Sequence, residues 1–193
     1  MPPKPKYSKE QIIEIALNVV SEKGVSALTA KELSIALKTS TSPIFTVFDT
    51  MQDVLDAVKA AAMSRFEEYA HKTKGLTPVF KQVGMQMILF AKEEPQLYQL
   101  IFMSANKKAE SFDDIYEQLG SVAYECLEVI QKDYGLSIQQ SKKLFSHVWI
   151  HTFGIGTLCA TGVCTFGDEQ ISSMLTEIFT SMIMLIKSKN NLS

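Results

Sequence analysis

The sequence predicts an all-α protein, and three observations carry this prediction. Apolar residues recur at intervals of three and four along most of the 193 residues, which is the period of a helix that buries one face. The alternation of apolar and polar residues that marks a half-buried strand is absent from the sequence. A serine or threonine, followed three residues later by Gln, Glu or Asp, precedes several of the apolar stripes, and this spacing caps the first turn of a helix.

The first two predicted helices are short. Ser8 and Gln11 form a capping box, and Gly24 ends the helix that they begin, because glycine readily takes the left-handed conformation at a helix C-terminus. Thr29 and Glu32 form a second capping box before the next helix. The residues expected to face the core are Ile12, Ile15, Ala16, Val19 and Val20 in the first helix, and Leu33, Ala36 and Leu37 in the second.

A third short helix follows a tight polar link, Lys38–Ser40. Pro43 lies in its first turn, where the missing N–H costs little. Thr50 and Asp53 form a third capping box and start a long helix that is expected to run to about Lys72. The apolar residues of the third segment are Ile44, Phe45 and Phe48.

Longer helices are expected in the rest of the chain. Glycine and proline supply the breaks between them, at Gly75, Pro95, Gly135 and Gly167. The expected ranges are Pro78–Glu93, Pro95–Ala105, Phe112–Tyr134, Ile138–Gly162 and Asp168–Ser188.

Three short capped helices, with a tight turn between the second and third, are typical of a helix-turn-helix, whose third helix lies in the major groove of DNA. Residues Gln11–Val58 also resemble the DNA-binding domain of the TetR family of transcriptional regulators. Phe45 and Phe48 fall where that family usually has Tyr and Phe. The likeness is carried by Ile12–Gly24 (IIEIALNVVSEKG), Leu28–Leu37 (LTAKELSIAL), Ser40–Phe48 (STSPIFTVF) and the Asp-Val-Leu that begins at Asp53.

This resemblance implies two domains: a helix-turn-helix DNA-binding domain at 1–50, and a ligand-binding and dimerisation domain at 51–193. It further implies a repressor that a small-molecule effector releases from its operator by shifting the fourth helix. Trp149–Gly154 (WIHTFG) resembles a Trp-x-His-x-x-Gly signature in the penultimate helix of one branch of the family.

Two positions depart from the family pattern. The turn position that is commonly glycine is Lys38 here, so we expect that a lysine tolerates the turn or adds a phosphate contact. The lysine that usually opens the fourth helix and meets a phosphate is Met51, which removes one charge-assisted contact.

The expected DNA surface is local, because the net charge of the chain is −2. Helix N-termini at Thr29–Ala30 and Thr50–Met51 would present N–H groups to phosphates, with Lys4, Lys6, Lys9 and Lys38 nearby. The third helix carries no charge, so its hydroxyls, methyls and Phe45 would favour an A·T-leaning operator. The predicted DNA-contact residues are Lys6, Thr29, Ala30, Lys38, Ser40, Thr41, Ser42, Phe45, Thr46 and Thr50.

The C-terminal helices are expected to form a homodimer that spans the two halves of a palindromic operator. The last helix is apolar on more than one face, and small residues in the helix before it would allow close approach of a partner. A single large intramolecular core is the alternative. The predicted interface residues are Phe153, Thr157, Ala160, Met174, Ile178, Met182 and Leu185.

A small apolar effector is expected to bind inside the larger domain. Aromatic and methionine side chains at helical spacing would line its cavity, although the same residues are also typical of a plain core. The predicted lining residues are Met63, Phe66, Met85, Leu89, Phe90, Tyr98, Phe102, Tyr124 and Trp149.

We expect neither a metal nor another cofactor. His147 and His151 lie four residues apart on one helix, but the sequence identifies no Cys or acidic partner near them, so a hydrogen-bonded interior or interface histidine is the favoured interpretation. Cys126, Cys159 and Cys164 form no spaced framework and are interpreted as free thiols in a reducing compartment, with Cys159 and Cys164 buried in apolar surroundings.

The sequence carries no catalytic motif, so we expect no enzyme. It shows no signal peptide, and the longest apolar candidate, Val148–Phe166, is interrupted by glycines and polar residues. These features predict a cytoplasmic protein without a membrane span. The alternative function is a helical ligand-binding or scaffolding dimer that does not bind DNA, with Met51 and the uncharged third helix as signs of the loss.

Overall fold

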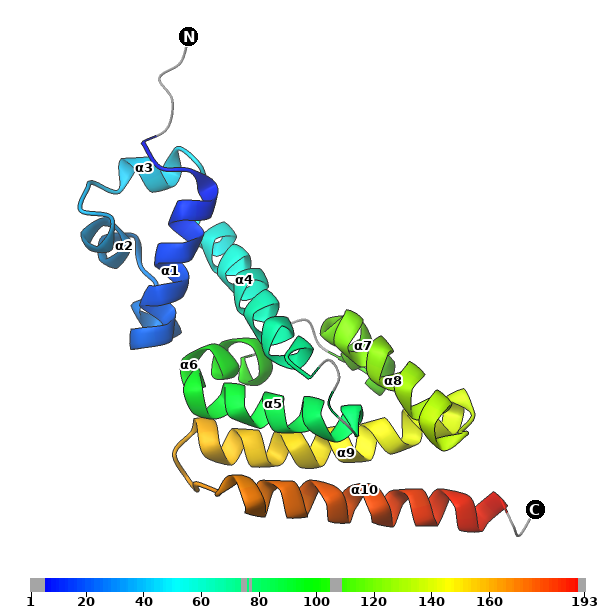
Figure 1. Cartoon of the computed structure of the whole chain (residues 1–193). Helices are drawn as coiled ribbons and strands as arrows, with labels where there is room; N and C mark the ends of the chain where they lie inside the picture. Colours follow the sequence, from blue (N-terminus) through cyan, green and yellow to red (C-terminus); the bar gives the residue numbers. More distant parts are fainter. Residues whose placement is uncertain (1–5, 74–75, 77, 105–108, 191–193) are drawn as a thin grey trace. The chain divides into compact units, whose positions relative to one another are not determined.

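The computed structural model describes residues 6–73, 76, 78–104 and 109–190, so Lys4, Gly75 and Ala105 lie outside it. All regular elements within these ranges are helices, which confirms the predicted all-α class (Figure 1). Two short non-α segments, Val25–Ala27 (3₁₀) and Gln99–Met103 (π), accompany the α-helices. The α-helices are α1 Lys9–Lys23, α2 Ala30–Ala36, α3 Ser42–Phe45, α4 Met51–His71, α5 Val79–Glu93, α6 Pro95–Tyr98, α7 Phe112–Leu119, α8 Ser121–Tyr134, α9 Ile138–Ala160 and α10 Asp168–Asn190.

The chain divides into two compact units. The first contains Met1–Phe66 and Glu94–Ser104, and the second contains Glu67–Glu93 and Ala105–Ser193. The first unit therefore extends beyond the predicted domain at 1–50, because most of α4 and the segment around α6 belong to it. Its larger size gives the three N-terminal helices additional apolar surface against which to pack.

Local capping fixes the ends of the first helices. Ser8 and Gln11 form the predicted capping box at α1. Thr29 accepts a hydrogen bond from the Glu32 N–H at 3.1 Å, which caps α2. The fully buried core side chains of this unit include Ile12, Ala16, Val20, Leu33, Ile44, Val54, Val58 and Phe66. The predicted burial of Leu33 and Leu37 is confirmed, but that of Ala36 is wrong because its face of α2 is exposed.

The segment that begins at α6 packs against α1 in the first unit. Gly24, at the end of α1, has φ 80° and ψ 167°, a conformation that only glycine adopts readily, and the nearest atom to a Cβ there would be Oε1 at the end of the flexible Gln96 side chain. The predicted single helix Pro95–Ala105 is wrong in detail. The α-helix ends at Tyr98, and Gln99–Met103 continues it as a π-helix.

The second unit is built around α5, α9 and α10, which run side by side, with α8 packed against both α5 and α9 (Figure 1). Its inner cluster contains Ile88, Ile155, Ile171 and Leu175, one or two from each of the three helices. A Cβ on Gly84 would lie 3.2 Å from Cδ1 of Leu175, so the absence of a side chain allows α5 and α10 to approach closely.

One helix that the sequence predicted to be continuous is divided into two in the structure. The range Phe112–Tyr134 was expected to be continuous, but α7 ends at Leu119 and α8 starts at Ser121. Gly120 stands between them with φ 55° and ψ −132°, a conformation that only glycine adopts readily. The predicted end of α9 at Gly162 is also corrected to Ala160, with Gly162 at φ 70° in the turn that follows.

The expectation that no stretch is long and apolar enough to cross a membrane is wrong for α10. Over Asp168–Ser188 this helix meets the length and composition of a membrane span, with a mean hydropathy of 1.2. A mostly buried core helix passes the same test, whereas 22% of this window is buried. In this structure Ile171, Leu175, Met182 and Ile186 of α10 are buried within the second unit.

Candidate functional site

The residues predicted to contact DNA lie on the surface of the first unit. Of the ten, all have exposed side chains except Ala30, which is half-buried. Phe45 is 46% exposed, whereas Phe48, three residues later, is only 4% exposed and belongs to the core. Ile44 is fully buried beside it. Ile44 and Phe48 thus anchor the short α3 in the core of the unit, while Phe45, Ser42 and Thr46 are exposed on its surface.

The link before α3 has an unusual backbone. Lys38 has φ 52°, the only positive φ of a non-glycine residue in the described part of the chain. This conformation lets the Thr39 N–H donate to the Ser34 carbonyl at 3.0 Å and ends α2 sharply. The prediction that a lysine tolerates this turn is confirmed, at a backbone cost of roughly 1 kcal/mol. The Lys38 side chain is exposed.

Tyr7 anchors the N-terminal segment, a role that the sequence did not reveal. Its hydroxyl donates a 2.7 Å hydrogen bond to the Leu37 carbonyl, beside Lys38. Because Lys6 directly precedes Tyr7, its backbone lies next to the link between α2 and α3. Lys9 places its ammonium 5.2 Å from the centre of the Phe48 ring, a cation–π contact at the base of α3.

Two further features complete this surface. Ile35 of α2 is a large apolar side chain on the exposed side, and it was not predicted to take part. Thr50 and Asp53 cap α4 reciprocally: the Thr50 N–H donates to Asp53 at 2.8 Å, and the Asp53 N–H donates to Thr50 Oγ1 at 3.2 Å. The surface around α3 therefore combines hydroxyls and exposed apolar groups, with lysines at its edge.

The predicted ligand-lining residues do not form one group. Met63, Phe66, Tyr98 and Phe102 belong to the first unit, and Met85, Leu89, Phe90, Tyr124 and Trp149 belong to the second. In the first unit, Phe102 packs its ring 5.1 Å from Phe66 and 5.0 Å from Tyr98, as in an aromatic core. Tyr124 is 52% exposed, so its prediction as a cavity residue is wrong: it lies on the outward face of α8.

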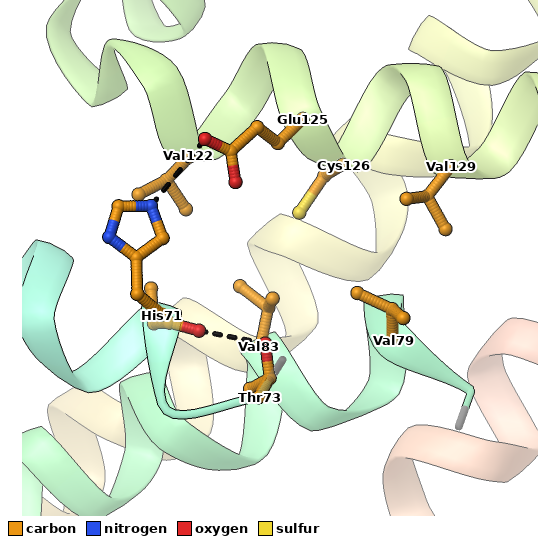
Figure 2. A pocket seen from close by; sticks show the side chains of 9 residues that line it. His71, Thr73, Val79, Val83, Val122, Glu125, Cys126 and Val129 are labelled. Atoms are coloured by element: carbon orange, nitrogen blue, oxygen red, sulfur yellow. Dashed lines mark hydrogen bonds and ion pairs between the residues drawn. The ribbon is translucent and has the colours of Figure 1, made fainter. Parts of the chain in front are cut away.

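The second unit contains a cavity of about 250 Å³ that none of the predicted residues lines (Figure 2). A narrow crevice of about 20 Å³, which includes the predicted Trp149, shares Val83, Val122 and Cys126 with it. Met85 and Leu89 line a separate hollow of about 170 Å³. The residues that line the cavity of about 250 Å³ are Ala70, His71, Thr73, Val79, Val83, Val122, Glu125, Cys126 and Val129.

The predicted interface residues differ in their exposure. Ala160 and Met182 are 6% and 7% exposed and pack inside their own unit, so their prediction as interface residues is wrong. Leu185 is exposed, and Phe153, Thr157, Met174 and Ile178 are half-buried. The exposed apolar residues Ile150, Leu158 and Met184 were not predicted. The helical period of α9 and α10 could have identified them as positions that the core of the unit does not cover.

The histidines and cysteines correct two expectations. His151 Nε2 is buried without a hydrogen-bond partner among the described residues, so the hydrogen bond expected of an interior histidine is not made by this atom within the chain. The thiols are not all buried, since Cys164 is exposed and Cys159 half-buried. Burial raises the pKa of Cys126 to about 12, with a smaller effect from Glu125. Residues 6–73, 76, 78–104 and 109–190 contain no group of three or more His, Cys, Asp or Glu side chains placed to hold a metal ion.

Comparison with known proteins names no relative. No protein-family model matches the chain, and no curated protein matches it.

Proposed function

We propose that the chain is a DNA-binding transcriptional regulator of the TetR type, in which α2, the Lys38 turn and α3 form a helix-turn-helix. The observation that carries the proposal is that the side chains of α3 and of the turn after it divide between the core and the exposed surface. Ile44 and Phe48 are core residues, whereas Phe45, Ser42 and Thr46 are exposed. An element that is anchored on one side and presents hydroxyls and an aromatic ring on the other is suited to read base edges.

The chemistry of this surface favours a particular kind of site. Thr methyl groups and the Phe45 ring would contact thymine methyls, and the hydroxyls would bond to several base edges. Without charge on α3, phosphate contacts fall to the exposed Lys6 and Lys38 and to backbone N–H groups. The protein would therefore select an A·T-leaning operator and show a shallow dependence of affinity on salt.

The proposed regulator acts as a homodimer in the cytoplasm. A palindromic operator has two half-sites and therefore needs two helix-turn-helix units. The exposed apolar residues Ile150, Leu158 and Met184 of α9 and α10 provide surface that a second copy of the chain would bury. A small effector that binds the DNA-competent and the incompetent form with different affinity would shift the balance between them. Release of the repressor from its operator then restores transcription of the target gene.

Selection from a random DNA library, followed by fluorescence anisotropy, tests the proposal. We expect an enriched palindromic sequence with an A·T-rich core, and at least tenfold weaker binding by Phe45→Ala. Val25→Ala, which truncates another exposed apolar residue of the first unit, serves as the matched control and should bind normally. Equal binding by Phe45→Ala and the wild type would show that α3 does not contact the bases of the operator.

A helical ligand-binding or scaffolding dimer is the second candidate. Met51, half-buried at the start of α4, favours it because a phosphate-contacting lysine is missing there. This candidate predicts that the library selection enriches no sequence at all.

A further inference from the structure

The cavity in the second unit is formed by three segments. Ala70 and His71 come from the last turn of α4, and Thr73 follows them. Val79 and Val83 come from the start of α5. Figure 2 shows the α8 residues Val122, Glu125, Cys126 and Val129 facing these side chains across the cavity.

Most of the cavity wall is apolar. The wall contains the four valines and Ala70, and the Cys126 thiol stays protonated at neutral pH because burial raises its pKa to about 12. The Thr73 hydroxyl already donates a 2.8 Å hydrogen bond to the Ala70 carbonyl. These groups favour the hydrocarbon part of a ligand and offer few polar contacts to it.

One side of the cavity is polar and carries a carboxylate. Glu125 Oε1 lies 3.5 Å from His71 Nε2, a contact drawn as a dashed line in Figure 2 that is an ion pair only when the imidazole is protonated. The two side chains are 58% and 39% exposed, so the pair contributes little stability and can open at small cost. Among the described residues that line the cavity there is neither lysine nor arginine, and Glu125 is the acidic side chain that a ligand would meet.

We propose that this cavity binds a small apolar molecule that carries one amine, with the hydrocarbon among the valines and the ammonium group on Glu125 in place of His71. A volume of about 250 Å³ corresponds to roughly eight water molecules, which suits a single ring or a short branched chain. The inference rests on the proposed function, because it gives the effector a site and a chemical class. His71 lies in the last turn of the helix whose first residue, Met51, follows the reading element, so displacement of His71 acts directly on α4.

Three probes of similar shape and different charge test the inference: benzylamine, benzyl alcohol and benzoate. Binding of each to the full chain is measured by isothermal titration calorimetry in the absence of DNA. We expect benzylamine to bind most tightly and benzoate least. Glu125→Gln should weaken benzylamine binding by about three- to fivefold, as expected for a partly exposed ion pair, and leave benzyl alcohol unchanged.

Glu128→Gln, an exposed carboxylate on the same helix and outside the cavity, is the matched control and should bind benzylamine as the wild type does. Val129→Trp should fill the cavity and abolish binding of all three probes. Its fold is checked by circular dichroism, and Val79→Phe is the second filling variant. Equal binding of benzoate and benzylamine, equal losses in Glu125→Gln and Glu128→Gln, or no binding of any probe would overturn the inference. Since DNA is absent, these results are independent of the operator selection.

Discussion

The Ser21 hydroxyl donates a 2.6 Å hydrogen bond to Oε2 of Glu94, across 73 residues of sequence. The guanidinium of Arg65 donates to the other oxygen of the same carboxylate, Oε1, at 3.1 Å. Glu94 thereby joins α1, α4 and the start of α6 within the first unit. Its side chain is the more buried partner of the ion pair, so its two hydrogen bonds replace most of its contact with water.

We expect Glu94→Ala to lower the free energy of unfolding by about 1–2 kcal/mol, because the Ser21 hydroxyl and the Arg65 guanidinium both lose an acceptor. Urea denaturation followed by circular dichroism measures the change. Glu22→Ala, on the exposed face of α1, is the matched control and should change stability by less than about 0.5 kcal/mol. Equal effects of the two variants would show that the Glu94 contacts do not stabilise the unit.

The thiols should differ in their reactivity and in its dependence on pH. Burial raises the pKa of Cys126, so its reactive thiolate remains scarce in the folded chain until the pH approaches about 12. At pH 8 we expect a maleimide to label the exposed Cys164 within minutes and Cys126 only after unfolding in urea. Peptide mass spectrometry reads both sites. Rapid labelling of Cys126 in the native chain would mean that the cavity wall opens readily.

Periodicity and capping residues predicted most of the helices, because both signals are local. The Ser8 and Gln11 capping box forms as expected, and α1 ends before Gly24 as predicted, although Gly24 takes φ 80° and ψ 167° and not the left-handed helical conformation. Gly120 was missed for a physical reason: a glycine inside a helical pattern is tolerated at about 1 kcal/mol, so the pattern alone does not reveal whether the helix breaks there. The structure gives it φ 55°, which interrupts the helix.

The candidate sites were predicted less completely. Phe45 and Phe48 are equally apolar, and only the fold decides that one is exposed and the other buried. The cavity brings His71 to within 3.5 Å of Glu125, a pairing that no local pattern encodes. The helical period shows which residues share a face of a helix, but it does not show which neighbouring element covers that face. The prediction that Tyr124 lines a cavity was wrong for this reason.

Exposed apolar residues of α9 and α10 should control dimerisation. We expect Leu185→Glu and Ile150→Glu each to weaken self-association by more than about tenfold, because a buried, unpaired carboxylate is costly. Sedimentation equilibrium measures the constant. Thr180→Glu places the same charge on an exposed position of α10 and is the control.

Ala160→Leu should behave differently from these variants. Ala160 is buried in its own unit, so a larger side chain should lower the free energy of unfolding by about 1–3 kcal/mol through overpacking. Self-association that persists in both Leu185→Glu and Ile150→Glu would place the dimer contact elsewhere.

Lys38→Gly separates the two roles of Lys38. Its left-handed backbone is strained for any residue with a Cβ, so we expect the glycine variant to raise the free energy of unfolding by about 0.5–1 kcal/mol. Lys31→Gly, within the helical backbone of α2, should instead lower it by a similar amount. Urea denaturation distinguishes these signs. A loss of stability in Lys38→Gly would mean that the side chain contributes more than the strain costs. If Lys38 also meets a phosphate, the stabilised variant should bind the selected operator more weakly, and the slope of log affinity against log salt should fall by about 1.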